Sequence, residues 1–134
     1  MRSIPWLLPG RRLAAYLGCR VEALDHGHAV IRLPFRPELL RPGGTISGPA
    51  MMTLADVTIW GAVLSMIGPV ALAVTTDLTF HFLRKPAPGD LLATASMLQL
   101  GRRLAIGQCT IAGTHDDRPV AHAVGTYALP EAGG

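Results

Sequence analysis

Charged and aromatic residues are both scarce in this chain of 134 residues, at 16% and 5%. Of the twelve basic residues only Lys85 is a lysine, and the rest are arginines scattered along the sequence. No aromatic residue alternates with a basic patch, so nucleic-acid binding is disfavoured. A net charge of +3 that comes mainly from arginine suits a small molecule carrying phosphate groups.

Cysteines are few as well, and neither Cys19 nor Cys109 belongs to a Cys-x-x-Cys pair. Disulfide frameworks and zinc sites need clustered cysteines, so both are disfavoured. The histidines also lack metal-ligand spacing; they are His26, His28, His81, His115 and His122. No signal peptide is evident, because prolines at positions 5 and 9 interrupt the first apolar run. We therefore expect no metal site, and a cytoplasmic protein with reduced thiols.

One long hydrophobic run is present, and a single charge lies within it. Residues 50–66 read as a helix of about 17 residues that follows a glycine-rich turn and Ser47-Gly48-Pro49. Pro49 suits the first helical position and Ser47 suits the N-cap. Apolar side chains cover this helix on all sides, so it must lie inside the protein. The one charge is Asp56, and an ionised carboxylate is costly to bury without a partner.

Two strands before this helix and four after it are predicted. Residues 19–25 and 28–33 are typical of a hairpin, and period-two alternation marks 74–84, 90–100, 104–113 and 119–129. Short turns imply antiparallel neighbours, and only a curled sheet covers every face of the helix. We expect one α+β domain over 1–134: about six antiparallel strands wrapped around one long central helix. A short N-terminal helix at about 10–17 (within segment 1–18), a loop at 35–44 and a loose tail at 130–134 complete it. Residues 50–74 are long enough to span a membrane, but their polar residues and the Gly-Pro break at 68–69 argue against membrane association.

Five short motifs occur in an order that resembles a known family. They are Thr45-Ile46-Ser47-Gly48-Pro49, Leu54-Ala55-Asp56, Val74-Thr75-Thr76-Asp77-Leu78, the turn 84–90 and Gly101-Arg102-Arg103-Leu104. Together they resemble the acyl-CoA thioesterases of the phenylacetate-degradation (PaaI-like) type, which have the hotdog fold, over residues 21–130. The resemblance implies an acyl-CoA substrate, with coenzyme A as part of the substrate and no separate cofactor.

The chain departs from the family pattern at the start of the central helix. The family has His-Gly-Gly there, with an acidic residue nine positions after the His. Ser47 replaces that His and Pro49 replaces the second glycine, whereas Gly48 and Asp56 keep their places. An asparagine often seen six positions before the His is Arg41 here. The resemblance therefore assigns the oxyanion-binding glycine to Gly48 and the catalytic carboxylate to Asp56.

The spacing of these two residues predicts an oligomer. Thioester hydrolysis needs a group that activates water and a donor that holds the oxyanion, and the free N–H groups of a helix start can serve as that donor. Gly48 and Asp56 lie eight residues apart, or roughly 12 Å along a helix, so one small reacting group cannot touch both. If two central helices pair antiparallel, Asp56 of one subunit meets Gly48 of the other. We expect a homodimer or a dimer of dimers.

The remaining site residues are hypotheses with alternatives. Asp56 is the general base or the nucleophile, or a structural acid only. Ser47 and Thr75 are nearby polar contacts, with Ser47 more typical of an N-cap than of a nucleophile because no Gly-x-Ser-x-Gly motif is present. Four cationic residues are candidates for the phosphates of coenzyme A, or ordinary solvated residues: Arg84, Lys85, Arg102 and Arg103. The alternative function is a non-catalytic acyl-CoA-binding hotdog protein, prompted by the missing His. A hydratase is disfavoured because no acid–His pair surrounds Asp56.

Overall fold

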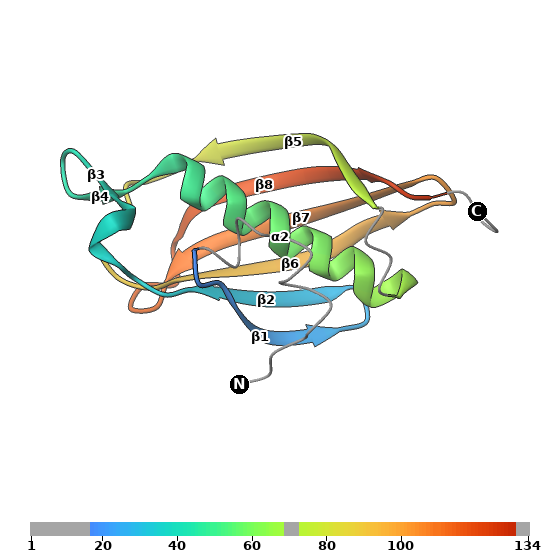
Figure 1. Ribbon diagram of the computed structural model, residues 1–134, viewed down its shortest axis with the longest axis horizontal. Helices are drawn as coiled ribbons and strands as arrows, with labels where there is room; N and C mark the ends of the chain where they lie inside the picture. The colour runs from blue at the N-terminus through green and yellow to red at the C-terminus, as the bar shows by residue number, and fades with distance from the viewer. Residues whose placement is uncertain (1–16, 69–72, 131–134) are drawn as a thin grey trace.

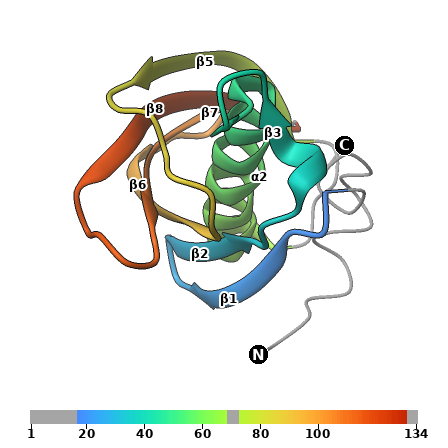
Figure 2. The ribbon, with the colours of Figure 1, turned by 90° about the vertical axis from the view of Figure 1, so that its left-hand side faces the viewer.

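A six-stranded antiparallel sheet curls around one long helix, as the computed structural model of the chain shows (Figure 1, Figure 2). The structure describes residues 17–68 and 73–130. The sheet has the order β1-β2-β6-β7-β8-β5. Its strands are β1 (Arg20–Asp25), β2 (His28–Leu33), β5 (Val74–Phe82), β6 (Leu91–Leu100), β7 (Leu104–Gly113) and β8 (Pro119–Ala128). The predicted wrapped sheet is confirmed; the helix predicted at 10–17 lies almost wholly outside the described residues, as does most of the tail.

The helix α2 (Gly48–Ile67) forms the core of the domain. It begins two residues earlier than predicted, directly after its N-cap, Ser47. The C-cap is Gly68, which has a φ of 91° and donates its N–H to the Leu64 carbonyl at 2.8 Å. By length and composition it resembles a membrane-spanning helix, yet 67% of its most apolar stretch is buried within the protein. Its side chains therefore pack against the strands that surround it.

The sheet approaches this helix most closely where β7 carries Gly107. A Cβ atom added at Gly107 would lie 2.7 Å from Cγ2 of Ile59 on α2, closer than real Cβ contacts. Any larger residue at this position would push the strand away from the helix, so glycine is required for the close packing of β7 on α2.

A small hairpin lies beside the start of α2, where a loop was predicted (Figure 2). The 3₁₀-helix η1 (Pro37–Leu39) leads into β3 (Leu40–Arg41), which pairs with β4 (Thr45–Ile46). Two glycines with φ of 101° and 78°, Gly43 and Gly44, form the turn between these strands. Strands of two residues are too short to show alternation, which is why the sequence pattern indicated only a loop.

A bulge in the edge strand β5 changes which side chains face the helix. Unbroken alternation over 74–84 would place Val74 on the face of Leu78 and Phe80 and Thr75 on the opposite face, but the register with β8 shifts between Thr75 and Asp77. An extra residue at a bulge inverts the facing of everything before it. Val74 is therefore 59% exposed, and Thr75 lies opposite Tyr127, whose side chain is fully buried. The alternation predicted over 74–84 is therefore interrupted at the bulge, which a period-two pattern does not reveal.

Candidate active site

Two hydroxyl groups hold the carboxylate of Asp56. Its Oδ1 atom accepts hydrogen bonds from Thr75 Oγ1 at 2.8 Å and from the Tyr127 hydroxyl at 2.5 Å. The same Tyr127 hydroxyl lies 2.8 Å from the backbone carbonyl oxygen of Asp56. Thr75 and Tyr127 are cross-strand partners on β5 and β8, brought onto one face by the bulge. The carboxylate is thus held in one orientation at the boundary between the core helix and the edge strand.

Tyr127 was missed by the sequence analysis, although a signal for it existed. In β8 the inward positions carry small residues, Ala121, Ala123 and Gly125, and Tyr127 continues the same row. A buried tyrosine needs an acceptor for its hydroxyl, and Asp56 is the only charged residue of the helix that this row faces. Following the inward positions along β8 would therefore have identified Tyr127 as a partner of Asp56.

The start of α2 leaves one backbone donor for a ligand. The Ser47 Oγ atom accepts from the Ala50 N–H at 3.2 Å, so the N-cap interpretation of Ser47 is confirmed. The Met51 N–H bonds the Ser47 carbonyl at 3.3 Å, and Pro49 has no N–H. No described residue accepts a hydrogen bond from the Gly48 N–H. A free N–H at the positive end of a helix is suited to an anion or oxyanion.

A pocket of about 350 Å³ opens beside Gly48. Apolar side chains form part of its wall: Ile46, Met51, Phe82 and Leu83. Cationic residues also line it, namely Arg41, Arg84 and Lys85. The ring of Phe82 lies so close that a Cβ added at Gly48 would be 3.1 Å from its Cζ atom. The pocket therefore combines an apolar wall, one backbone donor and positive charge.

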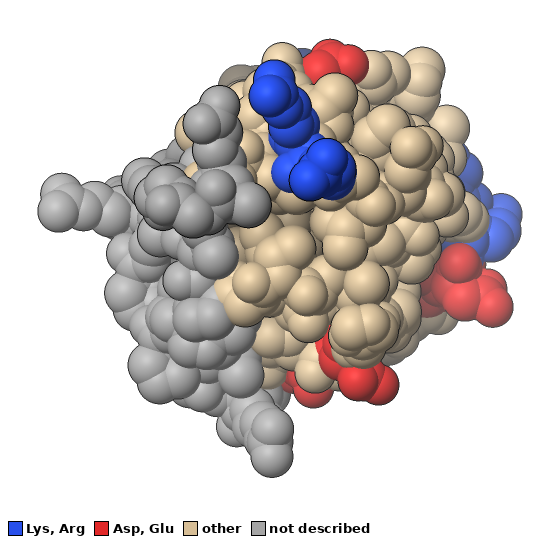
Figure 3. All heavy atoms as spheres, turned by 90° about the vertical axis from the view of Figure 1, so that its right-hand side faces the viewer, with Lys and Arg blue, Asp and Glu red and all other residues tan. Residues whose placement is uncertain are grey.

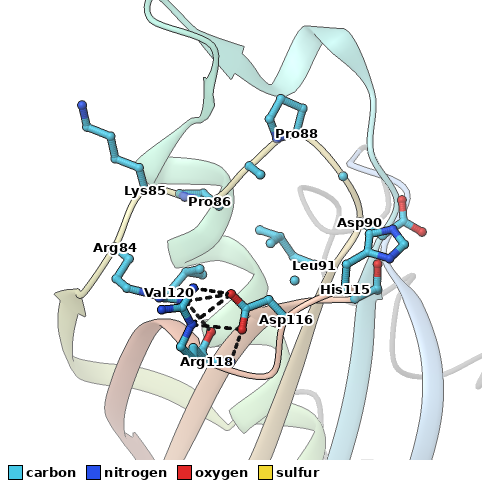
Figure 4. Close-up of a pocket in the computed structure, with 14 residues that line it drawn as sticks. Arg84, Lys85, Pro86, Pro88, Asp90, Leu91, His115, Asp116, Arg118 and Val120 are labelled. Atoms are coloured by element: carbon cyan, nitrogen blue, oxygen red, sulfur yellow. Dashed lines mark hydrogen bonds and ion pairs between the residues drawn. The ribbon is translucent and has the colours of Figure 1, made fainter.

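A second pocket of about 280 Å³ shares Arg84, Lys85 and Pro86 with the first. Within it, Asp116 forms ion pairs with Arg84 at 3.3 Å and with Arg118 at 2.9 Å (Figure 4). Hydrogen bonds from the Arg118 guanidinium and backbone hold the pKa of Asp116 well below its usual range. In Figure 4 the Lys85 side chain points away from this network. Arg84 is thus committed to a carboxylate, whereas Lys85 is not.

The other sequence-predicted residues are not brought together within one protomer. Gly48 and Asp56 lie on the same helix, eight residues or about 12 Å apart along its axis. Arg102 and Arg103 lie in the turn between β6 and β7, at the opposite end of the molecule from β3 and β4 (Figure 1). Figure 3 looks at that end, where a group of Lys or Arg side chains stands on an otherwise tan area and Asp or Glu side chains lie at the margins. One protomer therefore holds the parts of the site at separate places.

Known proteins are similar to this chain in sequence. Residues 43–118 match the Thioesterase superfamily. An inferred esterase of Halobacterium salinarum is 36% identical over 121 residues, which cover 84% of this chain and 80% of that protein.

Solved structures of thioesterase-type proteins are also similar to this chain. An inferred thioesterase from Silicibacter sp. is 39% identical with a TM-score of 0.83, over 93% of this chain and 87% of that one. The PaaI protein of the Escherichia coli phenylacetic acid degradation operon is 25% identical with a TM-score of 0.81, over 92% of both chains. The resemblance to PaaI-like proteins of the hotdog fold is confirmed, and thioester hydrolysis is the general chemistry that these relatives support. The chain belongs to the Thioesterase superfamily.

Proposed function

We propose that the protein hydrolyses the thioester bond of an acyl-CoA to give a free acid and coenzyme A. The observation that carries this proposal is the Asp56 carboxylate, held by two hydroxyl donors on the core helix of a thioesterase-superfamily chain. As a general base, Asp56 takes a proton from a water molecule that attacks the carbonyl carbon. As a nucleophile, it forms an acyl anhydride that water then hydrolyses. In both routes the C–S bond breaks and the thiolate of coenzyme A takes up a proton.

The oxyanion that forms on the carbonyl oxygen is bound by the Gly48 N–H of the partner subunit. Asp56 and Gly48 both lie beside β5, which among the described strands pairs only with β8 and leaves its other edge open. An exposed edge strand with apolar ends is normally covered. Val74, Phe82 and Leu83, at or just beyond the ends of β5, are 52–59% exposed.

Pairing β5 with its copy about a two-fold axis covers this edge. The Val74 end of one strand then lies near the Phe82 end of the other, so Asp56 of each protomer comes to Gly48 of its partner. The same pairing brings the Arg102–Arg103 end of one protomer to the side on which the partner's helix begins. In this arrangement the hairpin with Arg102 and Arg103 binds the phosphates of coenzyme A.

No cofactor takes part in the proposed reaction, since coenzyme A arrives with the substrate. A reducing compartment such as the cytoplasm suits the two free cysteines, which are buried. Burial raises the pKa of the Cys19 thiol to about 11 and of the Cys109 thiol to about 12. Both therefore stay protonated at neutral pH and are poor nucleophiles.

The test is release of free coenzyme A thiol, measured with DTNB over short, long and aromatic acyl-CoAs. Asp56→Asn should lower kcat/KM by about 10²–10⁴ for every substrate, because a general base or nucleophile is lost. The matched control is Asp77→Asn, which changes an exposed carboxylate of β5, the strand that carries Thr75; it should stay within twofold of wild type. Full activity of Asp56→Asn would exclude the assignment.

A non-catalytic acyl-CoA-binding protein is the second candidate. It is favoured by one observation: Ser47, which stands where the family has His, uses its hydroxyl to cap the helix. This alternative predicts binding of acyl-CoA by calorimetry with no release of thiol from any substrate of the panel.

A further inference from the structure

Two of the cations beside Gly48 have no carboxylate partner among the described residues. Arg84 is paired with Asp116, but neither Arg41 nor Lys85 forms an ion pair with any described residue. Both line the pocket of about 350 Å³ that Gly48 also lines. Two cations without a counter-ion in the described part of the chain, in a partly apolar pocket, favour an anionic ligand.

The backbone around Arg41 is tied to the start of the helix. The Arg41 carbonyl accepts from the Gly44 N–H at 3.0 Å and closes the hairpin turn, and Arg41 pairs with Thr45 across the hairpin. Immediately before it, the Leu39 carbonyl accepts from the N–H of Ser47, the N-cap of α2, at 2.8 Å. The base of the Arg41 side chain is therefore fixed relative to the Gly48 N–H. Arg41 also stands at a position where the family often has asparagine.

The size of the pocket decides which anion these cations can reach. A pocket of about 350 Å³ is about 9 Å across if it is roughly spherical. The diphosphate of coenzyme A is separated from the thioester sulfur by about thirteen bonds, or about 15 Å when extended at roughly 1.2 Å per bond. With the carbonyl oxygen on a Gly48 N–H, the phosphates lie beyond this pocket, whereas the far end of a short acyl group lies within it.

We propose that the acyl group carries a second carboxylate, so that the substrates are mono-thioesters of dicarboxylic acids with about five or six carbons. Arg41 and Lys85 bind the free carboxylate, and the apolar wall of the pocket packs against the methylene groups. From the thioester carbonyl to the terminal carboxylate an adipyl group extends about 6 Å, which with one hydrogen bond of about 3 Å spans the pocket. This inference rests on the proposed thioester hydrolysis.

The experiment compares adipyl-CoA with hexanoyl-CoA, which have the same number of acyl carbons and differ in one carboxylate. Wild type should have a kcat/KM at least about tenfold higher for adipyl-CoA, as expected for hydrogen bonds to a charged group. Arg41→Gln should remove most of that preference, because it lowers kcat/KM for adipyl-CoA much more than for hexanoyl-CoA. Lys85→Gln should act in the same direction. Arg20→Gln, which removes an exposed arginine of β1, is the matched control and should leave the preference intact.

Acyl-pantetheine substrates lack the phosphates of coenzyme A, so they show whether Arg41 binds the acyl carboxylate or the phosphates. The loss in Arg41→Gln should persist with adipyl-pantetheine. If Arg41→Gln instead weakened both acyl-CoAs equally and had no effect on acyl-pantetheines, Arg41 would bind the phosphates of coenzyme A and the inference would be overturned. Equal hydrolysis of adipyl-CoA and hexanoyl-CoA by wild type would overturn it as well and leave thioester hydrolysis standing.

Binding to Asp56→Asn keeps the two proposals distinguishable if no thiol is released. In that protein the dissociation constant of adipyl-CoA, measured by calorimetry, should be at least about tenfold lower than that of hexanoyl-CoA. Tight adipyl-CoA binding without turnover in wild type would overturn the proposed function and support the carboxylate-binding pocket. Equal dissociation constants would overturn the pocket assignment whatever the enzyme does.

Discussion

The two ends of β5 lie beside the two halves of the candidate site, and these halves are built differently. At the Val74 end the carboxylate of Asp56 is held by Thr75 and Tyr127, so its hydrogen bonds come from its own protomer. At the Phe82 end the Gly48 N–H has no acceptor among the described residues. Two cations of the pocket beside it, Arg41 and Lys85, form no ion pair within that part of the chain. The first half is complete without a ligand and the second is left open. This difference supports the proposal that the reactive group and the binding groups come from different protomers.

The strongest test of this division mixes two inactive proteins. Asp56→Asn lacks the carboxylate and Gly48→Pro lacks the backbone donor, and proline is tolerated at a first helical position. A mixed dimer has one site with both defects and one site with neither. With random assortment half of the dimers are mixed, so co-refolded protein should recover about a quarter of wild-type activity.

The readout is DTNB-detected hydrolysis, with each variant refolded alone as the control. A mixture as inactive as its components, with mixed dimers shown by native mass spectrometry, would mean that Asp56 and Gly48 do not act across a subunit boundary.

The open half can be examined by two changes at one position. Gly48→Pro should lower kcat by about 10²–10³, the usual effect of removing an oxyanion donor. Gly48→Ala keeps the N–H, but its Cβ atom would lie 3.1 Å from the Phe82 ring. Gly48→Ala should lower kcat only severalfold. Adding Phe82→Leu to this variant should restore kcat, because the smaller side chain leaves space for the added Cβ atom.

Equal loss in Gly48→Pro and Gly48→Ala would show that crowding by the ring, and not the missing donor, lowers the rate. Circular dichroism of each variant at the assay temperature would check that α2 is retained.

Much of the fold could be predicted from the sequence, because the long apolar helix needs a wrapped sheet and the four later strands alternate clearly. For the candidate site the sequence singled out Asp56 as the one charge in an apolar helix, whereas Gly48 was proposed from the family resemblance. The bulge at β5 could not be predicted, since it depends on pairing with β8 and not on composition. The bulge determines that the Thr75 side chain points toward Asp56. Tyr127 could be found only by comparing the inward row of β8 with the residues of the central helix.

The closed half is tested by removing its donors one at a time. Thr75→Val and Tyr127→Phe each delete one hydroxyl bonded to the Asp56 carboxylate, and each should lower kcat about tenfold, as expected for a hydrogen bond to a charged group. The matched control is Thr76→Val, whose exposed hydroxyl bonds the Thr126 carbonyl instead. It should change kcat by less than twofold. If all three variants behaved alike, the orientation of Asp56 would not depend on these hydroxyls.

The smallest effect concerns the turn that carries Lys85 to the open half. Asp90 anchors this turn by accepting from the Phe35 N–H at 2.7 Å and from Arg32 at 2.8 Å, and these contacts lower the pKa of Asp90 below its usual value. A folded-state pKa below the unfolded one adds stability that is present above the unfolded value, near 4, and is lost as the pH falls through the folded value. Asp90→Asn should therefore lower Tm at pH 7 by roughly 3 °C, for about 1 kcal/mol at a partly exposed pair.

The difference in Tm between Asp90→Asn and wild type should shrink as the pH is lowered below about 4, where wild type loses the same charge. Activity at pH 7 should change by less than twofold on hexanoyl-CoA, because neither Asp56 nor Gly48 touches this anchor. A difference that stayed constant from pH 7 to pH 3 would assign the stabilisation to packing of the turn and not to the charge of Asp90. The cations of the open half would then be positioned by the backbone of the β3–β4 hairpin, which carries Arg41, and of the turn after β5, which carries Lys85.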